Sequence, residues 1–206
     1  MAIASLSRFT VPLSSDQSAG AQGLLMPKLQ FRFRASFEGF GVSSSRVELT
    51  KQIVSFARPS VTFGDIDVHV YNSIVRLAGK PTWETVSVVL RDDAPGNVSR
   101  LVGEQLQKQF DFFEQSSASS GIDYKFVTRL EMLDGGNGGN APNTLETWEL
   151  YGCFLSQVQY GETNYSANEP IQITMTVKFD NALQTPLGSG VGSQSITRTR
   201  GQNVTL

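Results

Sequence analysis

Apolar and polar residues alternate along most of the central part of this chain. The clearest case is the segment 31–38, where apolar residues at odd positions are separated by polar residues at even positions. Because successive side chains of a strand point to opposite faces, this period of two predicts a strand with one buried face. Further strands are expected near residues 47–53, 61–70, 74–78, 83–91, 126–132, 147–160 and 171–179.

Two of these segments, 61–70 and 74–78, predict a long hairpin that turns near residues 72–73. Pro59 interrupts the chain before the hairpin, because proline supplies no N–H to a strand ladder. After the hairpin, the sequence Gly-Lys-Pro at 79–81 predicts a turn. The buried face of the hairpin is expected to carry Ile66, Val68 and Val70.

One segment has the periodicity of a helix instead. Its apolar residues recur every three or four positions and would share one helical face: Val98, Leu101, Val102, Leu106, Phe110 and Phe113. Asp92 and Asp93 precede the segment, where carboxylates cap a helix and complement its dipole. We therefore expect a mainly β protein with one flanking α-helix that covers a sheet.

The order of these elements predicts one central domain with an arm at each end. The β domain is expected over residues 28–181, between an N-terminal arm at 1–27 and a C-terminal arm at 182–206. Both arms are rich in Ser, Gly, Gln and Thr, so neither buries much apolar surface alone. Such segments are either disordered or ordered only against a neighbouring molecule, and both alternatives stay open.

Composition excludes several classes of function. The 206 residues carry 17 Lys and Arg against 19 Asp and Glu, which argues against a strong grip on nucleic acid. No stretch approaches the roughly 18 apolar residues of a membrane-spanning helix, and no signal peptide is recognisable, so we expect a soluble protein without membrane contact. Cys153, the only cysteine, excludes an intrachain disulfide and is expected in the core.

The sequence offers little chemistry for catalysis. His69 is the only histidine, no Gly-x-Ser-x-Gly turn occurs, and the Gly/Asn-rich segment 134–140 lacks the Lys-Ser/Thr ending of a phosphate-binding loop and predicts a surface loop. We therefore expect neither an enzyme nor a cofactor. The candidate metal ligands are Asp65, Asp67 and His69, whose spacing of two puts them on one strand face, although the same spacing suits the hydrated face of any strand.

Several features together resemble a known family. They are the Phe-rich first strand, the long hairpin, the helix, the segment Ala-Gly-Lys-Pro-Thr-Trp-Glu-Thr-Val-Ser-Val-Val-Leu-Arg-Asp-Asp at 78–93, and the segment Trp-Glu-Leu-Tyr-Gly-Cys at 148–153. Over about residues 28–181 the chain resembles the tail tube proteins of T-even-like contractile-tailed phages, which are related to type VI secretion tube proteins. The longer arms and the Gly/Asn loop depart from that pattern.

This resemblance implies two packed antiparallel sheets, as a sandwich or barrel, with a flanking helix. It also implies a structural virion protein, made in the host cytoplasm, that forms stacked hexameric rings around a conduit for viral DNA. The implied partners are further copies of the chain, a contractile sheath protein, and baseplate and tail terminator proteins, with no specific DNA binding. The alternatives are a baseplate tube initiator, or a tube protein of a type VI or extracellular injection system.

The hairpin is the segment where assembly is expected. Its alternating polar face suggests that it reaches an adjacent ring or subunit, and the candidate interface residues are Asp65, Asp67, His69, Tyr71, Asn72 and Ser73. A different class of protein, a monomeric carbohydrate- or metal-binding β-domain, would use the two Asp residues, His69, Trp83 and Trp148 instead.

Overall fold

The computed structural model describes residues 28–42, 46–134, 142–166 and 168–186, without the side chains of residues 46–48 and 186. Most of both predicted arms and nearly all of the Gly/Asn segment therefore lie outside the described residues. The chain divides into two units, Met1–Arg32 and Phe33–Leu206. In the described part of the first unit, the Arg32 N–H donates to the Leu29 carbonyl at 3.2 Å and closes a turn. The fold below is that of the second unit.

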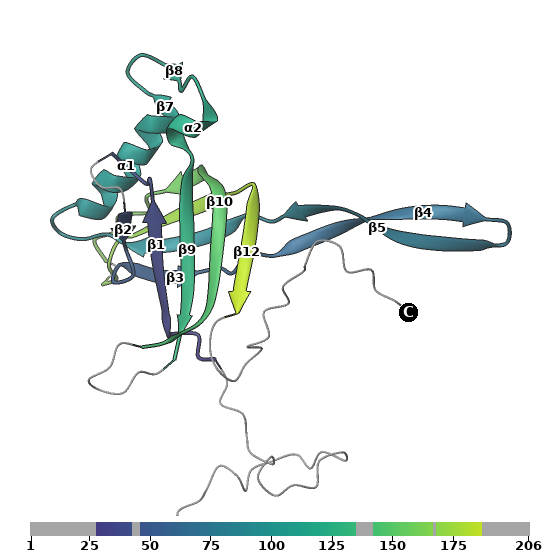
Figure 1. Ribbon diagram of the computed structural model, residues 1–206. Helices are drawn as coiled ribbons and strands as arrows, with labels where there is room; N and C mark the ends of the chain where they lie inside the picture. Colours follow the sequence, from purple (N-terminus) through teal and green to yellow (C-terminus); the bar gives the residue numbers. More distant parts are fainter. Residues whose placement is uncertain (1–27, 43–45, 135–141, 167, 187–206) are drawn as a thin grey trace, which may run out of the picture. The chain divides into compact units, whose positions relative to one another are not determined.

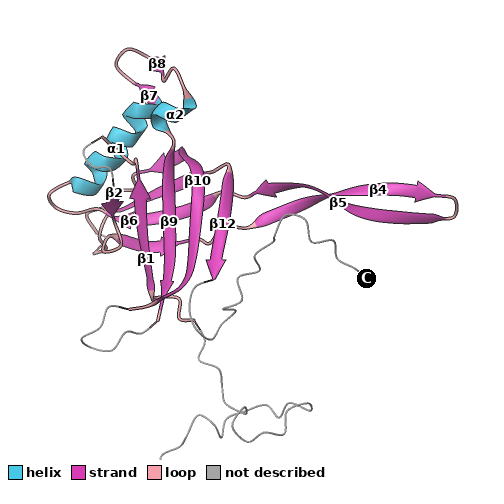
Figure 2. Cartoon of the chain, in the orientation of Figure 1, coloured by secondary structure: helices cyan, strands magenta, loops and turns pink. Residues whose placement is uncertain are grey.

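Two antiparallel sheets share one long strand (Figures 1 and 2). Sheet A runs in the order β2, β1, β9, β10 and β12, and sheet B continues from the second half of β10 through β11 and β6 to β3. The bounds are β1 Phe33–Glu38, β2 Arg46–Glu48, β3 Ile53–Phe56, β6 Val86–Arg91, β9 Phe126–Leu133, β10 Thr144–Gln159, β11 Gln172–Lys178 and β12 Asn181–Pro186.

The shared strand β10 changes sheets at an irregularity in its middle. Its pairing with β9 shifts between Leu150 and Cys153, and Gly152 between them adopts the left-handed φ of 67°. Beyond this point β10 pairs with β11, whereas its first half pairs with β12. A β-bulge bends a strand in this way, so one strand serves two sheets.

The expected fold class is confirmed: the protein is mainly β, with packed antiparallel sheets and few helices. Helix α1 spans Asn97–Gln109, and the short helix α2 spans Gly121–Tyr124. Two short strands, β7 Phe110–Asp111 and β8 Ser116–Ser117, lie between them and pair with each other. None of the described helices is long and apolar enough to cross a membrane.

The start of α1 follows the prediction, but its end does not. The Asp93 carboxylate accepts a hydrogen bond from the Val98 N–H at 3.0 Å, which lowers the pKa of Asp93. The helix stops at Gln109 because Phe110 adopts extended backbone angles, and Phe113 is 95% exposed. The spacing of apolar residues by three or four positions therefore continues beyond the end of the helix, although the last of these residues, Phe113, is not buried. The second helix, α2, was not predicted and begins with a capping box at Ser120.

The core lies between the sheets and extends beneath α1. Three phenylalanines form its aromatic centre: the ring centroids of Phe37 and Phe40 are 5.3 Å apart, and those of Phe40 and Phe126 are 5.0 Å apart. Apolar side chains from both sheets and from α1 pack around them, including Val88, Leu90, Val98, Val102, Leu130, Leu150, Ile173 and Met175. Cys153 belongs to this core, where burial raises the pKa of its thiol to about 11.

The long hairpin forms as predicted, with a longer second strand. Strand β4 spans Val61–Val70 and β5 spans Ser73–Trp83, so the turn lies at residues 71–72. The predicted turn at 79–81 is wrong: these residues belong to β5 and form an irregularity opposite Phe63–Asp65. At the other end of the domain, β12 extends through residues 182–186 of the segment assigned to the C-terminal arm.

The aromatic centre yields a test of the fold. The change Phe37→Ala removes a fully buried ring that contacts Phe40 and Phe126. We expect it to lower the free energy of unfolding by about 3–5 kcal/mol, because the cavity relaxes only in part. Urea denaturation followed by circular dichroism measures this loss. The control Phe113→Ala removes an exposed ring and should stay within about 0.5 kcal/mol; equal losses in both variants would contradict the assignment of the core.

Candidate assembly surface

Among the strands that the structure describes, β4 and β5 pair only with each other. The register of this hairpin places Ile66 opposite Leu77, Val68 opposite Val75, and Val70 opposite Ser73. Tyr71 adopts a positive φ of 45° at the turn, and the Ser73 hydroxyl donates to the Val70 carbonyl at 3.0 Å. Figure 1 shows the resulting ribbon extending beyond the two sheets. Two-stranded ribbons are at most marginally stable in water, so this one needs further contacts.

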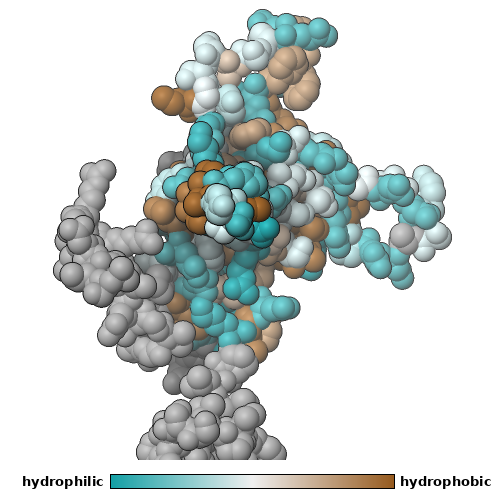
Figure 3. All heavy atoms as spheres, turned by 90° about the vertical axis from the view of Figure 1, so that its right-hand side faces the viewer, coloured by the Kyte–Doolittle hydropathy of each residue, from teal (hydrophilic) through white to brown (hydrophobic). Residues whose placement is uncertain are grey.

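One face of the ribbon is apolar but uncovered. The expectation that Ile66, Val68 and Val70 lie in a buried face is wrong, because each is between 40% and 51% exposed. Val75 and Leu77 of the opposite strand are exposed to a similar extent. In Figure 3, where the hairpin points toward the viewer, apolar and hydrophilic side chains adjoin on the exposed surface. Clusters of exposed apolar side chains are typical of surfaces that interact with another molecule.

The predicted candidate residues lie on the other face and at the tip. Asp65, Asp67 and His69 follow one another at every second position of β4, and Asp67 forms an ion pair with Arg76 across the ribbon, at 3.5 Å. Tyr71 is fully exposed at the tip, beside Asn72 and Ser73. Within the described residues, no group of three or more His, Cys, Asp or Glu side chains could hold a metal ion.

Two glycines of the hairpin, one in each strand, lie close together at an irregularity in the strand pairing. The register shifts between Phe63 and Asp65, where Gly64 lies beside Gly79 of β5. A Cβ atom at Gly79 would lie 2.8 Å from the Gly64 carbonyl oxygen, closer than real side chains approach. Gly64 has open space around it. Glycine at an irregularity of this kind lets two backbones approach closely.

The base of the hairpin is fixed to the core. The rings of Trp83 and Phe179 are 5.6 Å apart, and Trp83 packs against the core cluster. The Glu84 N–H donates to the Ser60 carbonyl at 3.0 Å and closes the base. Trp83 thus packs as an ordinary core aromatic. The ribbon is fixed to the core at its base, whereas its tip is exposed.

Sheet B has two open edges within the described part of the chain. Among the described strands, β3 at one end of the sheet pairs only with β6, and at the other end the second half of β10 pairs only with β11. Unpaired edges present N–H and C=O groups to which a further strand can add. The alternation of apolar and polar residues does not reveal these edges, because strand order is not encoded in the period of a single strand.

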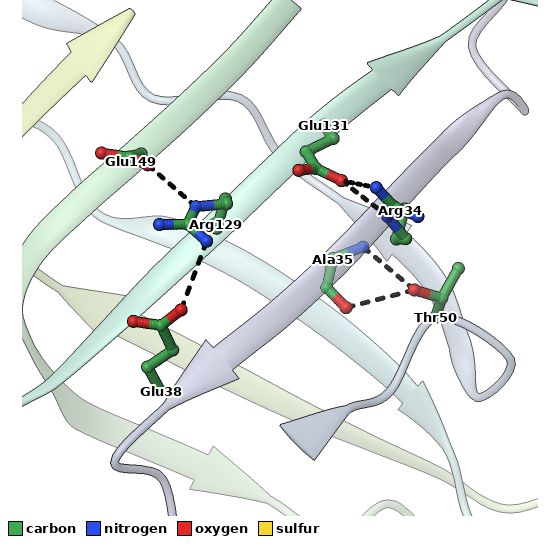
Figure 4. Close-up of polar contacts among 7 residues, drawn as sticks. All are labelled: Arg34, Ala35, Glu38, Thr50, Arg129, Glu131 and Glu149. Atoms are coloured by element: carbon green, nitrogen blue, oxygen red, sulfur yellow. Dashed lines mark hydrogen bonds and ion pairs between the residues drawn. The ribbon is translucent and has the colours of Figure 1, made fainter. Parts of the chain in front are cut away.

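The outward face of sheet A is a network of ion pairs (Figure 4). Arg129 contacts Glu149 at 2.8 Å and Glu38 at 3.2 Å, and Arg34 contacts Glu131 at 2.5 Å. The hydrogen bond from the Tyr151 hydroxyl and the nearby Arg129 lower the pKa of Glu149. Two arginines are thus paired with three glutamates across three strands.

The outward face of sheet B has a different character. Within its four described strands this face carries no carboxylate, and Arg91 and Lys178 are its charged residues. Most of the other outward positions are hydroxyl, amide or valine side chains, and Phe154, the register partner of Lys178, adds one aromatic ring; the remaining positions are Ser55, Ser87, Val89, Gln157, Gln159, Gln172, Thr174 and Thr176. The two sheets therefore present surfaces of different charge.

No protein-family model matches the sequence, and no curated protein matches it. Among solved structures, the chain is similar to a chain of the anti-feeding prophage baseplate, with a TM-score of 0.59 and 12% identity over 79% of this chain and 98% of that chain. A chain of the anti-feeding prophage tube-terminating cap matches with a TM-score of 0.59 and 11% identity, over 80% of this chain and 95% of that chain.

A third similar structure is the sheath–tube complex of PVC, an extracellular contractile injection system, in its extended state. Its matching chain has a TM-score of 0.54 and 12% identity, and the match covers 78% of this chain and 93% of that chain. At such low identities these likenesses establish a shared fold. The fold that the resemblance to tail tube proteins implied is thereby confirmed.

The close approach of Gly64 and Gly79 predicts how the hairpin responds when alanine replaces one of these glycines. Gly79→Ala brings a Cβ against the Gly64 backbone, so we expect the hairpin to lose about 1–3 kcal/mol of local stability. Amide hydrogen exchange over residues 61–83 should accelerate by about tenfold or more, while the unfolding midpoint of the two sheets changes little. The matched control is Gly64→Ala, which meets no atom within 4 Å. If both variants exchange alike, the close approach does not constrain the ribbon.

Proposed function

We propose that this protein is the tube subunit of a contractile phage tail, a structural virion protein without enzymatic activity. The observation that carries the proposal is the hairpin, an anchored ribbon whose apolar face has no partner within the described chain. It belongs to a fold that the chain shares with proteins of contractile injection systems. An exposed apolar ribbon on such a fold suits a subunit that is completed by its neighbours.

Ring formation follows from the open edges of sheet B. Direct pairing of β3 of one copy with the second half of β10 of the next would remove both edges, and repetition around an axis closes a ring. The similar baseplate structure is described as sixfold symmetrised, which supports a ring of six copies. Closing the ring in this way joins the sheets B of all copies into one continuous barrel wall.

In this proposal, the hairpin makes the contact between stacked rings. A ribbon that reaches from one copy to a different surface of another makes a heterologous contact, which generates an open filament instead of a closed dimer. The tip residues Tyr71, Asn72 and Ser73, together with the apolar face beneath them, are the groups we assign to this contact. The polar face with Asp65, Asp67 and His69 lies on the reverse of the same ribbon.

The conduit is lined, in this proposal, by the outward face of sheet B. Hydroxyl and amide side chains predominate there, so a passing DNA molecule meets few fixed cations and is not retained. The outer surface of the tube would carry the contractile sheath, and its two ends would meet baseplate and tail terminator proteins. The PVC sheath–tube complex provides the parallel for the sheath contact.

A second candidate is a baseplate or cap subunit of an extracellular contractile injection system. Two of the similar structures, with TM-scores of 0.59, come from the baseplate and from the tube-terminating cap of the anti-feeding prophage. Such a subunit would form a single ring and would not extend into a tube. Genes for capsid and terminase proteins beside this gene would favour the phage tail.

Negative-stain electron microscopy tests the function directly. Purified protein, alone and together with virion extract, should form rings and hollow tubes of uniform diameter. Rings that never stack would favour the second candidate. A protein that stays monomeric at all concentrations and is absent from virions would refute both assignments.

Shortening the hairpin separates ring closure from stacking. Deletion of residues 71–74 removes the tip, and we expect folded protein that no longer forms tubes, because the stacking contact is lost. Circular dichroism and light scattering verify the fold and the size of the particles. Tubes of normal length from this variant would rule out the hairpin as the stacking element.

A matched pair of substitutions resolves which face of the ribbon is buried in the tube. Val68→Asp puts a charge on the apolar face, and His69→Asp puts the same side chain on the reverse face one position away. We expect the first variant to lose tubes and the second to retain them, because an uncompensated charge is costly in an apolar contact. The opposite result would assign stacking to the polar face.

A further inference from the structure

One side-chain amide closes part of an open strand edge. The Gln109 Nε2 donates to the Leu155 carbonyl at 2.9 Å, and the Leu155 N–H donates to the Gln109 Oε1 at 2.8 Å. In an antiparallel sheet, two opposed residues exchange the same two hydrogen bonds. A glutamine amide carries one acceptor and one donor group, so Gln109 takes the place of one residue of a partner strand.

The position of this contact along β10 is specific. On this side of the strand, pairing with β9 ends at Cys153, opposite Phe126. Leu155 follows two residues later and is covered by Gln109. Beyond it the segment 156–159 has β11 as its strand partner on the other side. The Gln109 amide thus lies at the boundary between the covered and the open part of this edge.

Helix α1 holds Gln109 firmly in this place. Gln105, one turn earlier, is fully buried; its Nε2 donates to the Tyr124 carbonyl at 2.7 Å, and its Oε1 accepts from the Gly41 N–H at 3.0 Å. The Lys108 ammonium donates to the carbonyls of Gly39 and Gly41, at 2.9 and 3.0 Å. These bonds tie the end of the helix to two separate backbone segments, at residues 39–41 and at Tyr124, so the amide is not a mobile surface group.

The open part of the edge matches the other open edge of the same sheet in length. Segment 156–159 has four residues, and β3, which pairs only with β6, spans the four residues Ile53–Phe56. Beside Leu155 and Ser156 lies a groove of about 560 Å³, which is lined in part by the aromatic rings of Phe110, Tyr124 and Phe154. The groove leaves room for the side chains of an added strand.

We propose that Gln109 is the stop that sets the register of strand pairing between copies, with β3 of one copy adding along residues 156–159 of the next. The inference rests on the proposed ring function. Because Leu155 already has both backbone groups bonded, an incoming strand cannot slide toward Cys153. A slip of two residues would otherwise preserve the alternation of faces and change the curvature of the ring.

The test compares the wild type with Gln109→Leu, which keeps the size of the side chain but bonds neither group of Leu155. We expect a folded variant in which the Leu155 amide exchanges about five- to tenfold faster, as the loss of one hydrogen bond predicts. Its rings or tubes should show more than one diameter in electron micrographs. The control Gln107→Leu changes an exposed glutamine of the same helix and should give the wild-type diameter.

Gln109→Glu is the second variant, in case leucine prevents folding. Its carboxylate accepts from the Leu155 N–H but cannot donate to the carbonyl, so an intermediate spread of diameters is expected. Faster exchange at Leu155 together with a single wild-type diameter would overturn the proposal, as would unchanged exchange.

Failure of the proposed function gives a distinct result. If the wild type forms no rings, the uncapped edge of Gln109→Leu should still associate into soluble oligomers, detected by light scattering at concentrations where the wild type is monomeric. A variant that is then also monomeric would overturn the role of Gln109 in limiting strand addition.

Discussion

The structure depends on β10, a strand of sixteen residues that belongs to both sheets. Its change of direction requires the left-handed backbone of Gly152, where a Cβ atom would lie 2.1 Å from the Asp180 carboxylate. Asp180 in turn bonds Lys125 at 2.6 Å, and its N–H donates to the Tyr151 carbonyl at 3.0 Å. This small cluster joins the start of β9 and the end of β11 to the middle of β10, at the position where one sheet becomes the other. Any other residue at 152 would strain the backbone and displace that carboxylate.

Because one strand is shared, the sheets do not close on themselves. Sheet A uses both sides of the first half of β10, whereas sheet B uses one side of the second half. Within the described residues, an open edge therefore remains beside α1, and β3 leaves another at the far end of sheet B. The first residue of the edge beside α1, Leu155, is covered by the Gln109 amide. Proteins can protect a strand edge by covering it with another element instead of adding a strand.

The sequence patterns predicted most of the strands and the main helix correctly. They did not predict what packs against each of these elements. Period-two alternation located β1, β9, β10 and β11, because each buries one face in the core. The same signal could not show that Ile66 and Val68 are uncovered, since alternation reports two unlike faces and not what lies against them. The helical period likewise continued into Phe113, which is exposed. Gln109 bonds a residue 46 positions away, and no local pattern records such a contact.

The two proposed contacts between copies, the strand edge and the apolar face of the hairpin, rely on different interactions. This difference decides which feature of the assembly each contact can determine. A strand edge bonds through directional N–H and C=O groups, so it fixes register and angle between neighbours but adds only about 0.5–1.5 kcal/mol per hydrogen bond. The apolar face of the hairpin is not directional, and it stabilises a contact in proportion to the area that is buried. In the proposed tube, the edge is therefore suited to set the curvature of a ring, whereas the ribbon would supply adhesion between rings. A ribbon fixed to the core by Trp83 would do so only along a defined direction, so that the proposed stacking would repeat with one geometry.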